Sequence, residues 1–294
     1  MDIRALGLGL TFAVLWSSAF TAARIAVQYA PPFLMLSVRF LIAGAIAVGL
    51  AWLLGQRLRL GRAQWISIIL FGIFQNGIYL GLNFLAMQKI EAGLAAIIAS
   101  MLPIAVAATS WVLFREKLSP LGIIGLCAGL VGVLIIMAAR LQGGVDLTGV
   151  LLCVVGLAAL TTATLLMRAT KSSGNVLMVV GLQMLAGAGF LFPVSLLFET
   201  WVVTPSLPLA LAFVYMTFVP GLLATIIWFA LVNRIGATRA ATFHFLNPFL
   251  GVLVAFLMLN EHVSLRDALG VLVISAGILA VQVSRQNSRR RAQG

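Results

Sequence analysis

Long apolar runs follow one another along the sequence and are separated only by short polar, glycine-containing or proline-containing segments. Each run holds about 20 apolar residues, which is the length that a helix needs to cross roughly 30 Å of hydrocarbon. The pattern therefore predicts ten membrane-spanning helices, joined by segments too short to hold a soluble domain. The expected spans are about 5–27, 33–54, 65–86, 91–113, 120–138, 147–168, 176–198, 208–232, 238–259 and 265–284.

Composition supports this interpretation. Of the 294 residues, 62% are hydrophobic and 9% are charged, whereas a soluble domain is about half apolar and about a quarter charged. So few charges cannot cover the surface of a globule of this size, and the remaining surface must face lipid. We therefore expect an all-α integral membrane protein embedded in the lipid bilayer.

The net charge of +12 does not indicate a nucleic-acid partner, because the basic residues are scattered over short inter-helix segments and form no patch or stripe. The two cysteines, Cys127 and Cys153, lie in apolar stretches without CxxC or metal-site spacing. We expect both to be inert buried thiols, and we expect neither a metal nor a cofactor.

The distribution of lysine and arginine predicts how the helices are oriented. With a cytoplasmic amino terminus, 14 basic residues fall in inner segments and 4 in outer segments. Both termini are therefore expected in the cytoplasm, and the basic tail, residues 285–294, is expected to anchor this topology. The inner set is Arg4, Arg57, Arg59, Arg62, Arg115, Lys117, Arg168, Lys171, Arg234, Arg239, Arg285 and Arg289 to Arg291, and the outer set is Arg24, Lys89, Arg140 and Arg266.

The second half of the sequence repeats features of the first half. The matching pairs, each 145 residues apart, are Pro103 and Pro248, Glu116 and Glu261, Ser119 and Ser264, Gly125 and Gly270, and Gly132 and Gly277. They predict two five-helix repeats, over residues 1–140 and 141–284. Because five is odd, the second repeat must enter the membrane from the opposite side. Inverted repeats are typical of carriers that work by alternating access, with the substrate near the midplane between the halves.

These residues resemble a known family. The Pro-x12-Glu block of each half, the glycines that follow it, and Trp16-Ser17-Ser18 with Arg39 are similar to the EamA domain. The resemblance covers residues 5–284 and identifies the chain as a tandem pair of such domains in the drug/metabolite transporter superfamily. It implies a ten-helix bundle in the bacterial inner membrane that exports small metabolites. Similar proteins of this size include bacterial exporters of amino acids, aromatic ones among them.

Polar groups inside hydrocarbon are costly unless they meet a partner or a water-filled cavity, so they are the candidates for substrate binding. In the span 65–86, Asn76, Tyr79 and Asn83 share one helical face by their spacing, with Gln75 at its margin. That face meets either the substrate cavity or a neighbouring helix through interhelical hydrogen bonds.

Three other spans complete the candidate substrate site with Trp16, Thr225, Trp228, His244 and Asn247. The two tryptophans lie deep enough in their spans to form an apolar wall against a substrate, with core packing as the alternative. Pro248 removes a backbone donor, which leaves the carbonyl near His244 without its usual partner and favours a local kink. His244 itself is either a ligand or proton site or a hydrogen-bonded structural residue.

A further set of residues is expected to have structural or gating roles: Arg39, Pro103, Glu116, Pro248 and Glu261. For Arg39 we favour a clamp to Glu91 or Glu261, and the alternatives are that its guanidinium captures a carboxylate or that its side chain snorkels. The pair Gly125-x3-Gly129 permits close approach of backbones. We favour packing of the fifth span on the tenth over contact with a second copy, so that the chain is expected to be a monomer or a homodimer.

No Asp or Glu lies in the middle of a predicted span, so the embedded carboxylate of proton-coupled cation antiporters is missing from the sequence. We therefore favour facilitated diffusion over proton coupling through His244. The expected function is export of small zwitterionic metabolites, most of all amino acids, including aromatic or hydrophobic ones. Nucleosides, sugars and cationic drugs are the alternative substrates. A membrane-embedded enzyme is disfavoured, because no HExxH, GxSxG or P-loop motif occurs.

Overall fold

A computed structural model describes residues 3–56, 61–115, 119–167, 175–235 and 240–293, and over these ranges the chain is helical with no strand. Nine of the described helices are long and apolar enough to cross a membrane. The predicted tenth span, residues 238–259, corresponds to the shorter apolar helix Phe243–Leu259. The described chain therefore has the helices of a multi-pass membrane protein, as the apolar runs predict.

The helix bounds agree closely with the predicted spans, apart from breaks inside four of them. In chain order the elements are α1 (Ile3–Ala26), α2 (Pro32–Leu53), α3 (Arg62–Phe71), the π-helix η1 (Gly72–Tyr79), α4 (Leu80–Ala86), α5 (Ala92–Ser100), α6 (Leu102–Phe114), α7 (Pro120–Gln142), α8 (Leu147–Met167), α9 (Val176–Phe198), α10 (Leu207–Met216), the π-helix η2 (Thr217–Leu223), α11 (Ala224–Ile235), the 3-10 helix η3 (Ala241–Leu246), α13 (Asn247–Leu259) and α14 (Leu265–Gln293).

The described residues fall into two compact units, each of which combines segments from distant parts of the sequence. Unit 1 takes its residues from the ranges 1–21, 90–147 and 223–294, and unit 2 from 22–89 and 148–222. Each unit thus contains helices from both predicted repeats. The division into repeats at residue 140 stays a prediction.

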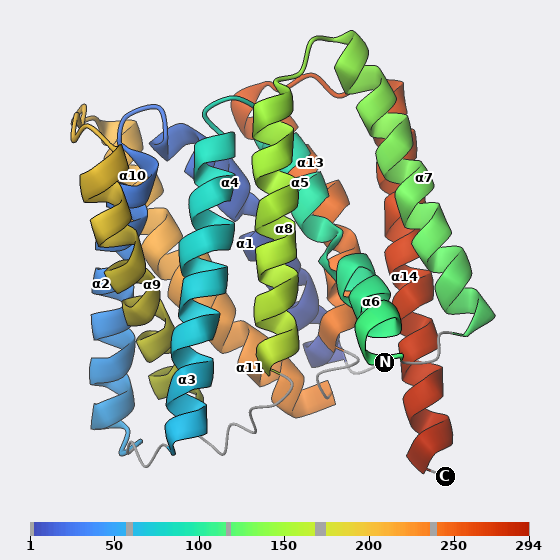
Figure 1. Cartoon of the computed structure of the whole chain (residues 1–294), viewed down its shortest axis with the longest axis horizontal. Helices are drawn as coiled ribbons and strands as arrows, with labels where there is room; N and C mark the ends of the chain where they lie inside the picture. The colour runs from blue at the N-terminus through green and yellow to red at the C-terminus, as the bar shows by residue number, and fades with distance from the viewer. Residues whose placement is uncertain (1–2, 57–60, 116–118, 168–174, 236–239, 294) are drawn as a thin grey trace. The chain divides into compact units, whose positions relative to one another are not determined.

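In unit 1, α7 packs along α14 (Figure 1). The contact depends on glycines, because a Cβ added to Gly125 would lie 2.7 Å from the carbonyl oxygen of Gly277. Likewise, a Cβ on Gly132 would lie 2.8 Å from the carbonyl oxygen of Gly270. Small residues let helix backbones approach this closely. The predicted packing of the fifth span on the tenth is therefore confirmed, and Gly129 is also used inside the unit, against Ile104 and α14.

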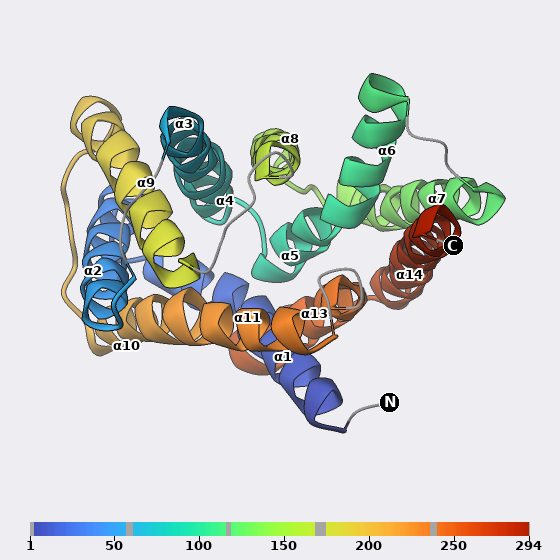
Figure 2. The same ribbon diagram turned by 90° about the horizontal axis from the view of Figure 1, so that it is seen from below.

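Unit 2 contains the same kind of contact between α2 and α9, which lie side by side (Figure 2). A Cβ on Gly44 would lie 2.9 Å from the carbonyl oxygen of Gly181, and a Cβ on Gly181 would lie 3.0 Å from that of Gly44. Each unit is thus built around one glycine-mediated pair of helices.

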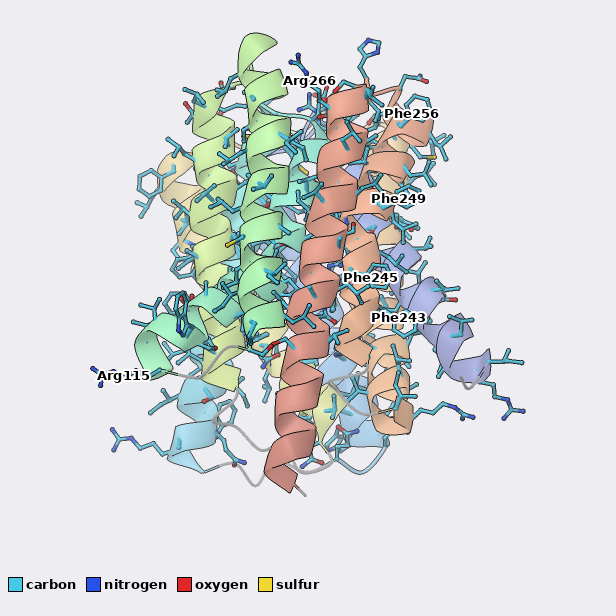
Figure 3. All side chains as sticks on the ribbon, turned by 90° about the vertical axis from the view of Figure 1, so that its right-hand side faces the viewer. Arg115, Phe243, Phe245, Phe249, Phe256 and Arg266 are labelled. Carbon is cyan, nitrogen blue, oxygen red and sulfur yellow. The ribbon has the colours of Figure 1, made fainter. Side chains whose placement is uncertain are left out.

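Irregular backbone segments recur at the spacing of the sequence repeat. The π-helices η1 and η2 begin at Gly72 and Thr217, which are 145 residues apart. The two residues with left-handed backbone other than glycine, among those described, are Arg115 at φ 52° and Asn260 at φ 53°, again 145 residues apart. Arg115 follows α6, and Phe256 lies in the last turn of α13. These two residues lie at opposite ends of unit 1 (Figure 3).

Proline explains part of this irregularity. The predicted span 91–113 is interrupted at Met101, between α5 and α6, because Pro103 in the first turn of α6 has no N–H for the preceding turn. Pro220 lies inside η2, where it removes one backbone donor from the helix.

One expectation about the thiols is wrong. Cys153 is buried, but Cys127 is exposed. Cys127 lies on α7, which uses its glycine face for packing on α14 and α6 and leaves other faces uncovered within the unit.

Candidate functional site

Four aromatic rings meet in unit 1 and form what we call the aromatic cluster: Phe12, Trp16, Trp228 and His244. The ring centroids of Phe12 and Trp228 are 4.7 Å apart, and those of Trp228 and His244 are 5.2 Å apart with the rings edge to face. Phe12 also contacts Trp16 at 5.7 Å and His244 at 5.3 Å. Separations of this size are those of directly packed aromatic pairs.

Hydrogen-bonding groups of Asn247 and Ser17 adjoin this cluster. Nδ2 of Asn247 lies 2.9 Å from Nδ1 of His244, so that with the amide as donor the ring proton is on Nε2. Ser17 donates to the backbone carbonyl of Asn247 at 3.5 Å. Oδ1 of Asn247 and Oγ1 of Thr21, one helical turn beyond Ser17, are buried without a hydrogen-bond partner, as are Oγ of Ser275 and both amide atoms of Gln282 on α14. An acceptor without a partner is available to an N–H group of a ligand.

The backbone around His244 differs from the expectation in one detail. The predicted irregularity before Pro248 is present, because the 3-10 helix η3 precedes α13. The carbonyl of His244 is not left without a partner, however, since the N–H of Asn247 donates to it. The tighter 3-10 pairing substitutes for the α-helical bond that proline removes. Beyond η3, Phe249 and Phe256 are about half exposed on α13 (Figure 3).

In unit 2, Tyr79 at the end of η1, Asn83 of α4 and Cys153 of α8 form a buried polar contact. Each has at most 3% of its surface exposed. Asn83 donates from Nδ2 to the carbonyl of Tyr79 at 2.9 Å, and its Oδ1 accepts from the thiol of Cys153 at 3.5 Å. Gly156 makes room for this amide, because a Cβ there would lie 2.7 Å from Nδ2 of Asn83.

Asn76 faces a different helix. Its Nδ2 donates to the backbone carbonyl of Gln183 on α9 at 3.0 Å, and Gly187 leaves room for its side chain. Asn76 therefore makes the interhelical hydrogen bond that was one of the two alternatives for this face. The single polar face expected from α-helical spacing is instead divided between α8 and α9, because residues 72–79 are π-helical.

Two other candidates, Gln75 and Thr225, are half-buried.

Arg39 is a buried cation in unit 2. Only 7% of its surface is exposed, and its Nε has no hydrogen-bond partner. The guanidinium carbon lies 5.1 Å from the ring centroid of Phe40, and Nη2 lies 3.6 Å from the point that a Cβ on Gly221 would occupy. The two proposed clamp partners, Glu91 and Glu261, belong to unit 1, so the clamp stays a prediction.

The described acidic residues that follow helices α9 and α13 bind the beginnings of other helices. In unit 1, Glu261 accepts from the N–H groups of Ala92 and Gly93 at 2.7 and 2.9 Å, which caps α5. In unit 2, Glu199 accepts from Phe33 and Leu34 at 2.8 and 2.9 Å, which caps α2. Carboxylates are favourable at helix amino ends, where N–H groups lack intrahelical partners. Pro103 and Pro248 both lie in the first turn of their helices.

Glu116 lies outside the described residues.

Sequence reasoning did not identify several of these residues. Phe12 precedes Trp16 by one helical turn, so helical spacing was a signal for its place in the aromatic cluster. The cap by Glu199 and the bond from the N–H of Met178 to Oε1 of Gln56 at 3.2 Å join residues more than 100 positions apart. No local pattern indicates such pairs.

Comparison with known proteins agrees with this architecture. The EamA-like transporter family matches residues 3–138 and again residues 147–282. The chain is 25% identical over 282 residues to the "uncharacterized transporter YvbV" of Bacillus subtilis, covering 96% of this chain and 92% of that protein. It is 25% identical over 279 residues to "Protein PecM" of Dickeya dadantii, covering 91% and 89%.

The "uncharacterized inner membrane transporter YedA" of Escherichia coli is also 25% identical, over 275 residues, covering 91% of this chain and 88% of that protein. A solved crystal structure with 22% identity has a TM-score of 0.67 and covers 96% of this chain and 99% of that one, which shows the same fold. With two consecutive family matches over nearly all of its length, this chain belongs to the EamA-like transporter family.

Proposed function

We propose that this transporter exports small zwitterionic metabolites, most of all amino acids with aromatic or hydrophobic side chains. In this proposal two inverted five-helix repeats exchange conformations and expose the substrate to each side of the membrane in turn. The observation that carries the proposal is the duplication: the family matches twice, and the irregular backbone segments recur 145 residues apart.

The backbone supports opposite orientations of the two repeats. Arg115 and Asn260 are equivalent by spacing, and both end a helix in left-handed conformation. Within unit 1 the helix ends marked by Arg115 and Phe256 lie at opposite ends of the unit (Figure 3). Together with the lysine and arginine bias of the connections, this favours a chain with both termini in the cytoplasm and a bacterial inner-membrane location.

The chemistry of the buried groups supports the substrate class. In unit 1, Trp16 and Trp228 offer an apolar surface next to Asn247, whose Oδ1 has no partner and can accept from an ammonium group. In unit 2, the buried Tyr79 and Asn83 add polar groups within a span. Apolar walls with a few fixed polar groups are typical of sites for small molecules.

The absence of Asp and Glu from the middle of the spans supports facilitated diffusion down the substrate gradient. Proton coupling through His244 is the alternative, favoured by its position beside Asn247 in the aromatic cluster. An imposed proton gradient that drives accumulation against the substrate gradient, and stops doing so when an uncoupler is added, would establish coupling instead.

Counterflow into proteoliposomes tests the substrate class. Purified protein is reconstituted with an unlabelled amino acid inside, and uptake of labelled amino acids, nucleosides, sugars and organic cations is measured outside. We expect counterflow of aromatic and large aliphatic amino acids and little of the other classes. Robust flux of a cation or nucleoside without counterflow of any amino acid would contradict the proposal.

A further inference from the structure

The buried guanidinium of Arg39 lacks a counter-ion within its own unit. The side chain comes from α2 and is 7% exposed, yet its Nε makes no hydrogen bond. No ion pair links it to any acidic residue in the described part of the chain. A buried charge without a partner is strongly unfavourable, so such groups in membrane spans usually serve a ligand or an ion pathway.

Unit 2 has no spare carboxylate to offer. Of the seven acidic residues in the sequence, only Glu199 falls within the ranges of unit 2. Both of its oxygens are occupied by the first turn of α2, through the N–H groups of Phe33 and Leu34, and Ser195 also donates to it at 2.7 Å. The ring of Phe40 stabilises the cation without neutralising it.

The guanidinium lies beside Gly221 of η2. A Cβ on Gly221 would lie 3.6 Å from Nη2 of Arg39 and 2.9 Å from the carbonyl oxygen of Met216. Any side chain at this position would therefore occupy space beside the guanidinium. Arg39 is seven residues beyond the start of α2, about 10 Å along the helix axis.

We propose that Arg39 binds the anionic group of the transported substrate, a carboxylate for an amino acid, through two parallel N–H···O bonds. This inference rests on the proposed function and names the group that the substrate must carry. A guanidinium fork matches the geometry of a carboxylate, and such charge-assisted bonds are stronger than neutral ones.

The test compares two substrates that differ only in the carboxylate: phenylalanine and phenylalanine amide. Counterflow is measured for the wild-type protein, Arg39→Gln and Arg39→Lys. We expect Arg39→Gln to weaken the apparent affinity for phenylalanine by about 10- to 100-fold, the usual range for a lost charge-assisted bond, and to leave the amide within about twofold. Arg39→Lys should lie between, because an ammonium keeps the charge but not the paired geometry.

Arg24→Gln is the matched control. Arg24 lies in the same unit and already donates to the backbone carbonyl of Met87, so its loss should not discriminate between the acid and the amide. Equal losses for both substrates in Arg39→Gln, or the same discrimination in Arg24→Gln, would overturn the inference. A lipid phosphate held by Arg39 would likewise affect the acid and the amide equally.

A binding measurement separates this inference from the proposed function. Thermal stabilisation of the purified protein is measured with phenylalanine, simple aromatic carboxylates and inorganic phosphate. Stabilisation of the wild-type protein by carboxylates, lost in Arg39→Gln and partly kept in Arg39→Lys, supports the site even if amino acids are not transported. Stabilisation that Arg39→Gln retains, or none by any of these anions, would overturn it.

Discussion

The aromatic cluster of unit 1 and the buried polar residues of unit 2 differ in their packing and in which groups have hydrogen-bond partners. In unit 1 the rings pack directly on one another, and the buried side-chain atoms without a partner belong to Asn247, Thr21, Ser275 and Gln282. In unit 2 the amides of Asn76 and Asn83 already have partners, and the unpartnered group is the cation Arg39. Burial alone therefore does not distinguish a candidate binding residue, and a buried group without a partner is the more informative signal.

The helix packing around these residues is alike in the two units. Each unit has a glycine-mediated helix pair, α7 with α14 and α2 with α9, and in each a glutamate that follows one helix caps another. Substitutions in the helix pairs and caps should therefore lower the stability of both units by similar amounts. Substitutions at the candidate binding residues should have different effects in the two units.

The largest effect is expected from overpacking the helix pairs. Gly125→Val in unit 1 and Gly44→Val in unit 2 each push a side chain into a backbone carbonyl less than 3 Å away. We expect each to lower the free energy of unfolding by about 2–3 kcal/mol, measured by thermal denaturation in detergent. Gly49→Val is the matched control on α2, because a Cβ there meets nothing within 4 Å. An equal loss in the control would contradict the packing.

A loss of substrate selectivity is expected from the aromatic cluster. Trp228→Ala removes a ring that packs on Phe12 and His244. We expect the apparent affinity for aromatic amino acids to fall by about tenfold relative to alanine, since burying a large side chain against an aromatic wall is worth roughly 1.5–3 kcal/mol. Competition counterflow measures the ratio. Trp111→Ala, which removes a half-exposed tryptophan outside the cluster, should leave the ratio unchanged.

The two asparagines with different partners should separate stability from transport. Asn76→Ala removes a hydrogen bond to Gln183 on α9, and we expect a loss of about 1 kcal/mol in stability with normal apparent affinity. Asn247→Ala removes the unpartnered Oδ1 together with the hydrogen bond to His244, and we expect weaker substrate affinity in addition to a similar loss of stability. Thermal denaturation measures the stability of both variants, and counterflow measures their apparent substrate affinity. Weaker apparent affinity in Asn76→Ala together with normal apparent affinity in Asn247→Ala would contradict these assignments.

The smallest effect is expected at the caps. Glu199→Gln and Glu261→Gln each keep an acceptor but remove the charge that faces a helix amino end. We expect each to lower stability by about 0.3–1 kcal/mol, and by similar amounts. A loss several times larger at one of the two would show that this carboxylate has a partner beyond its cap.

The sequence predicted what depends on periodicity and spacing. Apolar run length identified the spans, and glycine spacing predicted the contact of α7 with α14. The sequence did not predict the π-helices or the break at Met101, and it did not predict that Asn76 contacts α9 whereas Asn83 contacts α8. These features depend on which backbone groups the neighbouring helices leave unpaired. The cap of α2 by Glu199 joins distant positions and carries no local signal.

The central claim is that the two repeats have opposite orientations, and side-specific labelling tests it most directly. Single cysteines are introduced by Ile3→Cys, near the amino end, and by Gly143→Cys, after α7, with the exposed Cys127 replaced by serine. A membrane-impermeant maleimide is applied to spheroplasts and to inverted vesicles. We predict labelling at residue 143 only in spheroplasts and at residue 3 only in inverted vesicles; labelling of both from the same side would contradict the inverted repeat.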